Sequence, residues 1–472
     1  MSKLNYDILY EIFQNLQDLI NMTYSNDPDN LNKWINYKEF LRSQFSCLLV
    51  NKNWCEVMIP FLWSNPFKYA YKAHINSSLF KIIISHLSDN SIKILKNKNI
   101  IRANFQKLKL SYNYTRFCKY FHDLRNVFPV DSKMLLKEEI YKLFISECSS
   151  IKCLNSDMAY YPISKYPGAN ISLSNLYELN CSTTNQDFYY GLAQICKSIE
   201  KLHVKVIGYK KSHGIVKLIE MQTQIKYVFI VVYCECNMIA QALEKHVNSI
   251  IHLEITNYTS VIHFLIPKLI NLRYLKVLDD NYFELRKYVI YLVNHHNLQA
   301  LNLHFISLDT AINIIKNTNG NLWKIRIESI IGYDKAKEYN QTIYKYCPNI
   351  KYVTIFLSKD GTMEELEKIF IKCQHLEAIY IDDKIKREYI DKFLNLLLEL
   401  APLTLCKIHI SYITQSLKLF LINWVQRKGK KTLQFYYQFN SCYPCHIDSD
   451  IAHIVHKYDI KDFWNYYITW SA

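Results

Sequence analysis

The chain repeats one pattern of apolar and polar positions, apolar-x-x-apolar-x-apolar. It occurs at residues 176–181, 199–204, 225–230, 250–255, 272–277, 298–303, 322–327, 350–355, 376–381 and 405–410. Successive copies start 22–29 residues apart. The last two apolar positions are two residues apart, which predicts a strand with both side chains on one face. Near-uniform spacing predicts repeated units that bury their apolar sides by stacking on one another.

Helical patterns fill the gaps between these strands. Residues 362–373 are typical, because Met363, Leu366, Ile369 and Phe370 fall on one helical face. Strands that alternate with helices predict an α/β fold with a parallel inner sheet and outer helices. We expect this solenoid to cover residues 166–440, and the alternative is an ordinary α/β protein whose apolar spacing is coincidental.

A polar residue precedes several copies by three positions. It is a cysteine in "CKSI" (196–199), "CPNI" (347–350) and "CQHL" (373–376). This arrangement resembles the cysteine-containing leucine-rich repeat, in which a Cys ends the helix before the strand motif. The Asn or Cys that follows the strand in the strict repeat is not regularly present here, so we expect helices and turns of irregular length.

Alternation along each strand predicts which side chains face the inner side of the sheet. The residue between the two strand apolars points there, and we expect this inner face to bind a target protein. The predicted target-binding residues are His203, Phe229, Glu254, Lys276, Asn302, Arg326, Thr354, Tyr380 and His409. The alternative is that many of them are simply solvated.

A different pattern occupies residues 1–67. Residues 4–19 place Leu4, Ile8, Leu9, Ile12, Phe13, Leu16 and Leu19 at helical spacing on one wide apolar face. A strong turn signal, "SNDPDN" (25–30), follows, and then the apolar stretch 47–67 with Trp54 and Trp63. We expect a small three-helix module that is too small to bury all of its apolar side chains.

This module resembles the F-box. The line Leu4-Asn5-Tyr6-Asp7-Ile8-Leu9-Tyr10-Glu11-Ile12-Phe13 follows the family's opening, and Val50-Asn51-Lys52-Asn53-Trp54 follows its Val-x-Lys/Arg-x-Trp element. The chain departs from the family at Asn5, where proline is usual, and in a longer loop at about 20–36.

The resemblance implies that the module binds a Skp-type adaptor and, through it, a cullin ubiquitin ligase. The implied adaptor-binding residues are Leu4, Ile8, Leu9, Ile12, Phe13, Leu48, Val50 and Trp54. These positions mix module core with adaptor contact, and the alternative is that they pack only within the chain.

Two further segments complete the organisation. Residues 68–165 predict a rigid junction with irregular first repeats, because no Gly/Ser/Pro-rich tract interrupts them. Within it, 77–100 predicts helices and 105–110 an early strand. Residues 441–472 are expected to cap the C-terminal end.

Composition changes this picture little. The chain has 472 residues, half of them hydrophobic, and a net charge of +15 (57 − 42). The basic excess leaves nucleic-acid binding open, although the lysines are spread along the chain and the one dense run, 427–431, fits a helix end or turn.

The expected location is intracellular, in the cytoplasm, the nucleus or both. Asp7 and Glu11 rule out an N-terminal secretory signal. The fourteen cysteines are therefore expected to be reduced thiols. The longest apolar run, 227–240, is interrupted by Glu235 and is too short to span a membrane.

No motif predicts a catalytic site, a metal or a cofactor. "CYPCH" (442–446) has haem-attachment spacing but lacks a second Cys pair for zinc. Cys234 and Cys236 are expected to be packing residues, and His295-His296 has no carboxylate partner nearby in sequence.

We therefore expect a non-catalytic substrate receptor of a Skp–cullin–F-box ubiquitin ligase. The alternatives are a repeat scaffold without a ligase, and a basic nucleic-acid binder with steep salt dependence.

Overall fold

The computed structural model describes most of the chain. The described residues are 5–24, 42–69, 73–121, 134–182, 185–206, 212–232, 237–256, 264–278, 295–304, 306–328, 333–357, 363–381, 387–410, 416–428, 434–437 and 461–462. They fall into an N-terminal unit that ends at residue 225 and a C-terminal unit that begins at residue 226.

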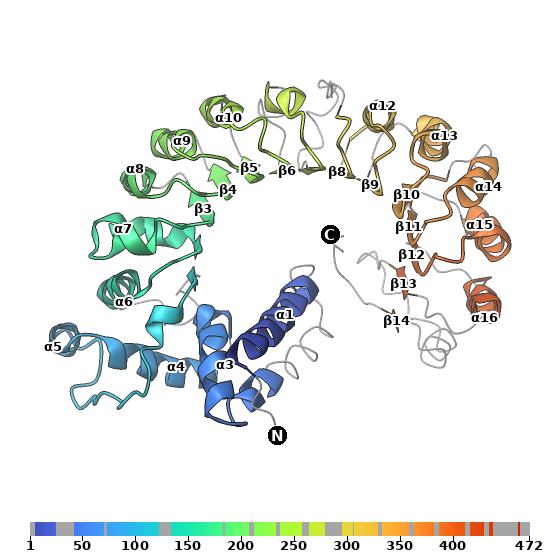
Figure 1. Cartoon of the computed structure of the whole chain (residues 1–472). Coiled ribbons are helices and arrows are strands. Elements are labelled where there is room, and N and C mark those ends of the chain that lie inside the picture. The colour runs from blue at the N-terminus through green and yellow to red at the C-terminus, as the bar shows by residue number, and fades with distance from the viewer. Residues whose placement is uncertain are drawn as a thin grey trace. The chain divides into compact units, whose positions relative to one another are not determined.

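The N-terminal unit begins with helices and continues as strand–helix units (Figure 1). Its α-helices are α1 (Tyr6–Tyr24), α3 (Lys52–Ser64), α4 (Ala73–His86), α5 (Asp89–Asn97), α6 (Met134–Glu147), α7 (Ala169–Ser172), α8 (Gln186–Ile195) and α9 (His213–Glu220). Its strands are β1 (Tyr120–Phe121), β2 (Cys153–Leu154), β3 (Glu178–Ser182) and β4 (Lys201–Val206). Its 3₁₀ helices are η1 (Pro66–Tyr69), η2 (Thr115–Phe117), η3 (Ser156–Tyr160) and η4 (Ile163–Lys165). Consecutive strands pair in parallel.

The C-terminal unit is a longer run of the same kind. Its strands are β5 (Tyr227–Val232), β6 (His252–Thr256), β7 (Tyr274–Leu278), β8 (Ala300–His304), β9 (Lys324–Glu328), β10 (Tyr352–Ile355), β11 (Ala378–Ile381), β12 (Lys407–Ile410), β13 (Gln434–Tyr437) and β14 (Lys461–Asp462). Its helices are α10 (Asn237–Glu244), α12 (Leu308–Lys316), α13 (Ala336–Tyr346), α14 (Met363–Lys372), α15 (Arg387–Leu400) and α16 (Ser416–Lys428), with η5 (Ile266–Lys268) and η7 (Tyr333–Lys335).

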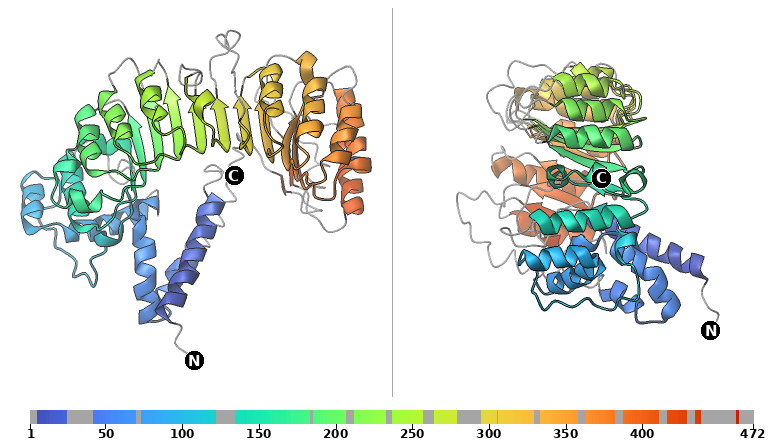
Figure 2. Two further views of the ribbon diagram at one scale, coloured as in Figure 1. Left: turned by 45° about the horizontal axis from the view of Figure 1, so that its top comes forward. Right: turned by 90° about the vertical axis from the view of Figure 1, so that its left-hand side faces the viewer.

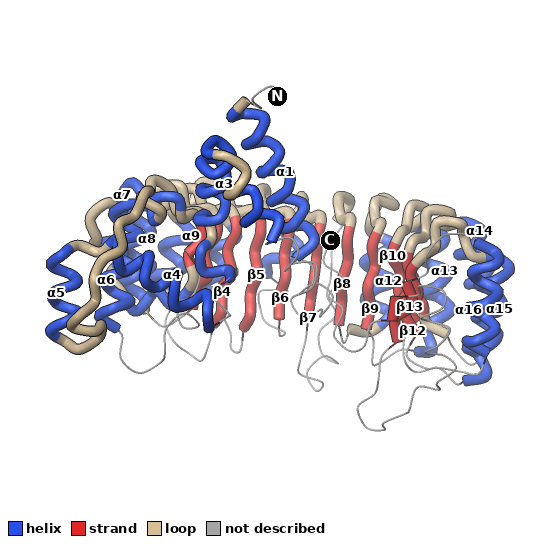
Figure 3. Tube along the Cα trace, turned by 90° about the horizontal axis from the view of Figure 1, so that it is seen from below, coloured by secondary structure: helices blue, strands red, loops and turns tan. Residues whose placement is uncertain are grey.

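These strands pair in parallel in chain order. They line the inner side of the unit's curve and the helices lie outside it (Figures 1 and 2). The same two layers are visible along the strands in Figure 3.

The ten predicted strands are all present. Each begins at the third residue of its motif, as Tyr274 does in 272–277. The predicted helix at 362–373 is α14, which buries Leu366, Ile369 and Phe370. The α/β class with an open, all-parallel sheet is confirmed, and the architecture is compatible with a solenoid.

Two details of the predicted boundaries differ. Residues 105–110 form no strand, and the first strand is β1. Leu108 instead donates its backbone N–H to Ser85 Oγ on α4, at 2.9 Å, so this segment is tied to a helix rather than to the sheet. The parallel pairing also continues past residue 440, because β14 pairs with β13.

Side-chain donors three residues before several of the motifs join successive repeats. Cys196 donates to the Leu173 carbonyl at 3.2 Å, and Gln222 Nε2 donates to the Cys196 carbonyl at 3.0 Å. His295 Nδ1 bonds the Leu269 carbonyl at 3.1 Å. At this position a cysteine, a glutamine and a histidine each bond a backbone carbonyl at the end of a helix in the preceding repeat.

A second set of side-chain donors lies two residues further along, just before the first apolar residue. Asn271, Asn297 and Asn321 each donate from Nδ2 to a backbone carbonyl of the preceding unit, at 2.8, 3.3 and 2.9 Å. These two sets of hydrogen bonds fix the register of neighbouring repeats and so hold the inner-face side chains in rows.

Candidate functional site

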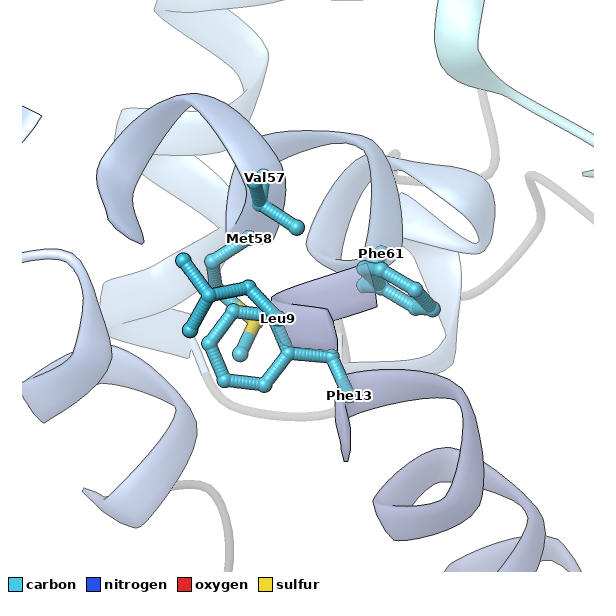
Figure 4. Close-up of a cluster of buried hydrophobic side chains, with 5 residues drawn as sticks. All are labelled: Leu9, Phe13, Val57, Met58 and Phe61. Carbon is cyan, nitrogen blue, oxygen red and sulfur yellow. The ribbon is translucent and has the colours of Figure 1, made fainter. Parts of the chain in front are cut away.

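The helical module at the N-terminus has a small closed core. Leu9 and Phe13 of α1 pack against Val57, Met58 and Phe61 of α3 (Figure 4). The rings of Phe13 and Phe61 meet edge to face with centroids 6.0 Å apart, a favourable aromatic geometry. This core fixes α1 on α3.

The start of α3 is set by Asn51. Its side chain accepts a hydrogen bond from the backbone N–H of Trp54 at 3.0 Å, which caps the helix. The capped turn places Trp54 against Phe13, with ring centroids 5.5 Å apart. Residues 50–54 therefore both cap the start of α3 and bring Trp54 against the module core.

The module also has large apolar side chains on its outside. Ile8 and Ile12, one helical turn apart on α1, are 48% and 45% exposed, and Leu49 and Val50 are 87% and 55% exposed. A turn of helix that exposes two isoleucines is unusual for a surface without a partner. We call Ile8, Ile12, Leu49 and Val50 the exposed apolar residues of the module.

The far end of α3 ties the module to the next elements of the same unit. The backbone N–H of Lys119 donates to the Ser64 carbonyl at 2.8 Å. The Trp63 ring stacks on Tyr114 with centroids 4.9 Å apart. Trp63 therefore packs within the chain, whereas the exposed apolar residues of the module are not covered by other parts of the chain that the structure describes.

The predicted adaptor-binding residues divide by position. Leu9 and Phe13 are buried in the module core, so they support the surface without forming it. Leu48 and Trp54 are half-buried against that core. Ile8, Ile12 and Val50 are exposed, and Leu4 lies outside the described residues.

Sequence reasoning missed other exposed apolar side chains in this module. Tyr6, Phe45 and Leu49 are each about half exposed or more. Tyr6 precedes Tyr10 by one turn, and Leu49 is next to Val50, so adjacency to the motif residues was the available signal.

The second surface is the inner face of the sheet. The register aligns the predicted target-binding residues in one row across neighbouring strands: Phe229 with Glu254, Glu254 with Lys276, Lys276 with Asn302, Asn302 with Arg326, Thr354 with Tyr380, and Tyr380 with His409. In the N-terminal unit, His203 aligns with Asn180 in the same way. The structure therefore brings these side chains of the C-terminal unit together.

A parallel row, two residues earlier on each strand, was missed. In the C-terminal unit it contains Tyr227, His252, Tyr274, Ala300, Lys324, Tyr352, Ala378 and Lys407. Alternation with a period of two places these residues on the same face, so the sequence did contain the signal.

Glutamates link the rows through histidine and lysine. Glu254 bonds His252 at 3.0 Å and Lys276 at 3.3 Å. Burial disfavours ionisation of Glu254, but the His252 hydrogen bond and the Lys276 charge outweigh it and lower the pKa. Glu178 of the N-terminal unit repeats the arrangement with His203 at 3.1 Å and Lys201 at 3.2 Å.

A third glutamate holds the centre of the face. Glu328 contacts Arg326 at 2.6 Å and His304 at 2.8 Å. Burial opposes its charge, yet the hydrogen bond from His304 and the charge of Arg326 lower its pKa to about 2. Glu328 is therefore ionised at neutral pH and orients Arg326.

Lys324 is the most unusual group of the face. It is 3% exposed on β9. Burial, followed by the positive charges of Arg326 and Lys276, lowers its pKa to about 8. The lowered pKa means that the protonated form of Lys324 destabilises the fold. Strongly shifted pKa values of this kind are common at functional sites.

Aromatic rings border the cations. His252 stacks on Tyr274 with centroids 4.0 Å apart, and Tyr380 stacks on His409 at 4.4 Å. The Arg326 guanidinium lies 5.5 Å from the Tyr380 ring centroid, within cation–π range. Burial, with the Arg326 charge, lowers the pKa of His409 to about 3, so this ring is neutral.

Thr354 is fully buried, and Asn302, Arg326, Tyr380 and His409 of the same row are also buried, at 3–7% exposure. The Thr354 hydroxyl accepts the backbone N–H of Ile327 at 3.0 Å. Thr354 thus completes the pairing between β9 and β10 and presents no surface to a target.

The described residues contain no group of three or more His, Cys, Asp or Glu side chains placed to hold a metal ion. "CYPCH" (442–446) and Cys234 with Cys236 lie outside the described residues. Within the described part of the chain, no helix has the length and apolar character needed to cross a membrane.

Comparison with known proteins adds no assignment. No protein-family model matches the chain, and no curated protein matches it. Function must therefore be argued from the two surfaces themselves.

Proposed function

We propose that the protein is the substrate-recognition subunit of a Skp–cullin–F-box ubiquitin ligase. The N-terminal module would bind a Skp-type adaptor, and the inner sheet face would bind the target protein. The protein itself would carry out no chemistry, because its contribution is to hold a target close to a ubiquitin-loaded enzyme.

The exposed apolar residues of the module carry the proposal. Ile8 and Ile12 stand on a helix that is already fixed by Leu9 and Phe13, so they are preorganised for a partner. Val50 and Leu49 add apolar surface beside the capped start of α3. The resemblance of residues 4–13 and 50–54 to the F-box supports an adaptor as that partner.

Co-purification tests the proposal. The full-length chain is expressed with a Skp-type adaptor and a cullin, and the double variant Ile8→Asp with Ile12→Asp is compared with it. We expect the wild type to retain the adaptor and the double variant to lose it, because two buried charges would face an apolar contact.

Asn53→Asp is the matched control, since it adds a charge at an exposed polar position of the same module. Circular dichroism should show all three proteins equally folded. If the wild type retains no adaptor, or if the double variant retains it fully, the ligase assignment is wrong, and a repeat scaffold without a ligase becomes the better description.

A further inference from the structure

The segment from α5 to β1 concentrates positive charge. Residues 90–122 contain eight Lys and Arg side chains and no Asp or Glu, so they supply 8 of the 15 net positive charges of the whole sequence. Other residues separate these cations, so no consecutive run of charge marks the segment in the sequence. The basic excess is therefore not distributed evenly along the chain.

A left-handed turn ends α5 and reverses the chain. Asn99 has a φ of 55°, and its backbone N–H donates to the Lys96 carbonyl at 2.9 Å. The backbone N–H of Ile100 donates to the Leu95 carbonyl, also at 2.9 Å. These two bonds satisfy carbonyls that the end of a helix leaves without an intrahelical partner, and they require a residue in the left-handed conformation, which asparagine tolerates.

The chain after this turn runs back beside α5. Lys96 Nζ donates to the Phe105 carbonyl at 2.8 Å near the end of the helix. Lys107 Nζ contacts the Asp89 carboxylate at 2.6 Å at the start of the helix. The reversal brings the cations of α5 next to those of residues 102–109. We call six of them the basic surface: Lys93, Lys96, Lys98, Arg102, Lys107 and Lys109.

The basic surface is open to solvent and little neutralised. Five of its six side chains are exposed, and Lys96 is half-buried. Within the part of the chain that the structure describes, Asp89 is the one carboxylate in contact with any of the six, and its own side chain is 93% exposed. The local balance is therefore 6 − 1 = +5. Cations without a carboxylate partner can neutralise the phosphates of a nucleic acid, which releases its counterions and favours binding.

Exposed amide side chains lie between these cations. Asn97, Asn99, Asn104 and Gln106 are all exposed. Amide groups, like Lys and Arg, donate hydrogen bonds to phosphate and sugar oxygens. The surface therefore offers neutral donors as well as positive charge to a phosphate–sugar backbone.

Rings and aliphatic side chains distinguish between the possible polyanions. Phe105 and Tyr112 are partly exposed on the returning chain, and the bases of a single strand stack on such rings. Ile94 and Leu108 are the large aliphatic side chains exposed among residues 93–109, at 37% and 46%. Two such residues provide little apolar area for insertion into a membrane. A single-stranded nucleic acid fits this combination better than an anionic lipid surface does.

We propose that the basic surface binds the backbone of a single-stranded nucleic acid without sequence preference. The cations contact phosphates, the exposed amides bond phosphate and sugar oxygens, and Phe105 and Tyr112 provide faces for base stacking. Lysine is a point charge on a flexible stem, so these contacts follow the backbone and read no base. The proposal does not rest on the ligase assignment, because the basic surface shares no residue with the exposed apolar residues of the module.

Fluorescence anisotropy with the full-length chain tests the proposal. The probes are labelled oligothymidylate and oligouridylate of about 20 nucleotides, titrated at several salt concentrations between about 50 and 200 mM. Four phosphate contacts on a single strand give a slope of about −2.8 for log affinity against log salt. We therefore expect the affinity to fall roughly 50-fold over this fourfold rise in salt.

A double variant locates the site. Lys93→Gln with Lys98→Gln removes two exposed cations that contact no carboxylate among the described residues, so the variant should fold normally. It should reduce the salt slope by about 1.4 and weaken binding at low salt by roughly tenfold. The matched control, Lys165→Gln with Lys345→Gln, removes the same charge from exposed positions outside the basic surface and should leave the affinity within about twofold. Thermal unfolding of both variants separates lost binding from lost folding.

Each other outcome rejects the proposal. No binding at low salt, or a salt slope near zero, would mean that the cations do not contact phosphates. Equal losses in the double variant and its control would mean that net charge, and not this surface, attracts the strand. Tighter binding to phosphatidylserine vesicles or to polyglutamate than to either oligonucleotide would make a lipid surface or an acidic protein the ligand. The variant Ile8→Asp with Ile12→Asp should bind both oligonucleotides normally, so adaptor binding is measured separately.

Discussion

The N-terminal module and the inner face of the C-terminal unit depart from ordinary burial in opposite directions. The module leaves Ile8 and Ile12 in solvent, although its core holds Leu9 and Phe13. The inner face buries Lys324 and Arg326, although the sheet's other face is apolar. Apolar groups outside and charges inside both cost free energy in the isolated chain. The two regions therefore differ in the kind of group that stands in an unfavourable environment, apolar in the module and charged on the sheet.

The largest expected effect is on stability, and it tests whether the buried residues of the module hold α1 on α3 independently of the exposed apolar residues. Phe13→Ala should lower the free energy of unfolding of the module by about 3–5 kcal/mol, because it removes a buried ring and leaves a cavity. Chemical denaturation followed by tryptophan fluorescence checks this, since Trp54 contacts Phe13. A loss below about 1 kcal/mol would mean that α1 is held by something other than this core.

Acidification tests the charges of the inner face. The pKa of Glu328 is lowered from 4.5 to about 2 in the folded chain. Its stabilisation is therefore complete above pH 4.5 and is lost as the pH falls toward about 2, a change of up to about 3 kcal/mol.

Denaturant midpoints between pH 6 and pH 2, compared with Glu328→Gln, measure this change. The variant should have a flatter acid limb than the wild type. Identical limbs would mean that Arg326 and His304 do not stabilise the Glu328 carboxylate in solution.

A third prediction concerns Lys324, whose charged form destabilises the fold, whereas the charged form of Glu328 stabilises it. The folded pKa is lowered to about 8 from 10.5, so the unfolded chain binds the proton more tightly and stability rises with pH between these values. Lys324→Met should therefore raise the free energy of unfolding at pH 7 by about 2 kcal/mol. Calorimetry at pH 7 and pH 10 checks it, and the gain should shrink at the higher pH.

Lys324→Met that is less stable than the wild type at pH 7 would show that the lysine is a structural group, and the contrast between the two surfaces would disappear.

The smallest expected effect is at the module surface. Ile12→Ala should change the free energy of unfolding by no more than about 0.5 kcal/mol, because Ile12 is 45% exposed. It should nonetheless weaken adaptor binding measured by calorimetric titration. A stability loss comparable to that of Phe13→Ala would place Ile12 in the core and remove it from the proposed contact.

The repeat could be predicted from the sequence because its physics is local. The spacing of Leu272, Leu275 and Val277 predicts one strand, and all ten copies of this motif were found as strands. The row of Lys276 and Arg326 follows from alternation. The segment 105–110 was wrongly predicted as a strand, since "FQKLKL" matches the motif but Ser85 binds its backbone.

Other features depend on contacts between distant residues. Leu9 and Ile12 look alike in a helical pattern, and only the position of α3 decides which is buried. The pKa of Lys324 depends on Lys276 and Lys407, which lie on other strands. The burial of Thr354 could not be predicted either, because its hydroxyl bonds the backbone N–H of Ile327 on the neighbouring strand.

The cysteines among the side-chain donors between repeats are sensitive to local opening. Cys196 and Cys373 point their thiols at carbonyls of the preceding unit, and burial raises the pKa of each to about 12. A thiol reagent can modify them only when neighbouring units separate. Their labelling rates would therefore compare how readily neighbouring repeats separate before β4 and before β11.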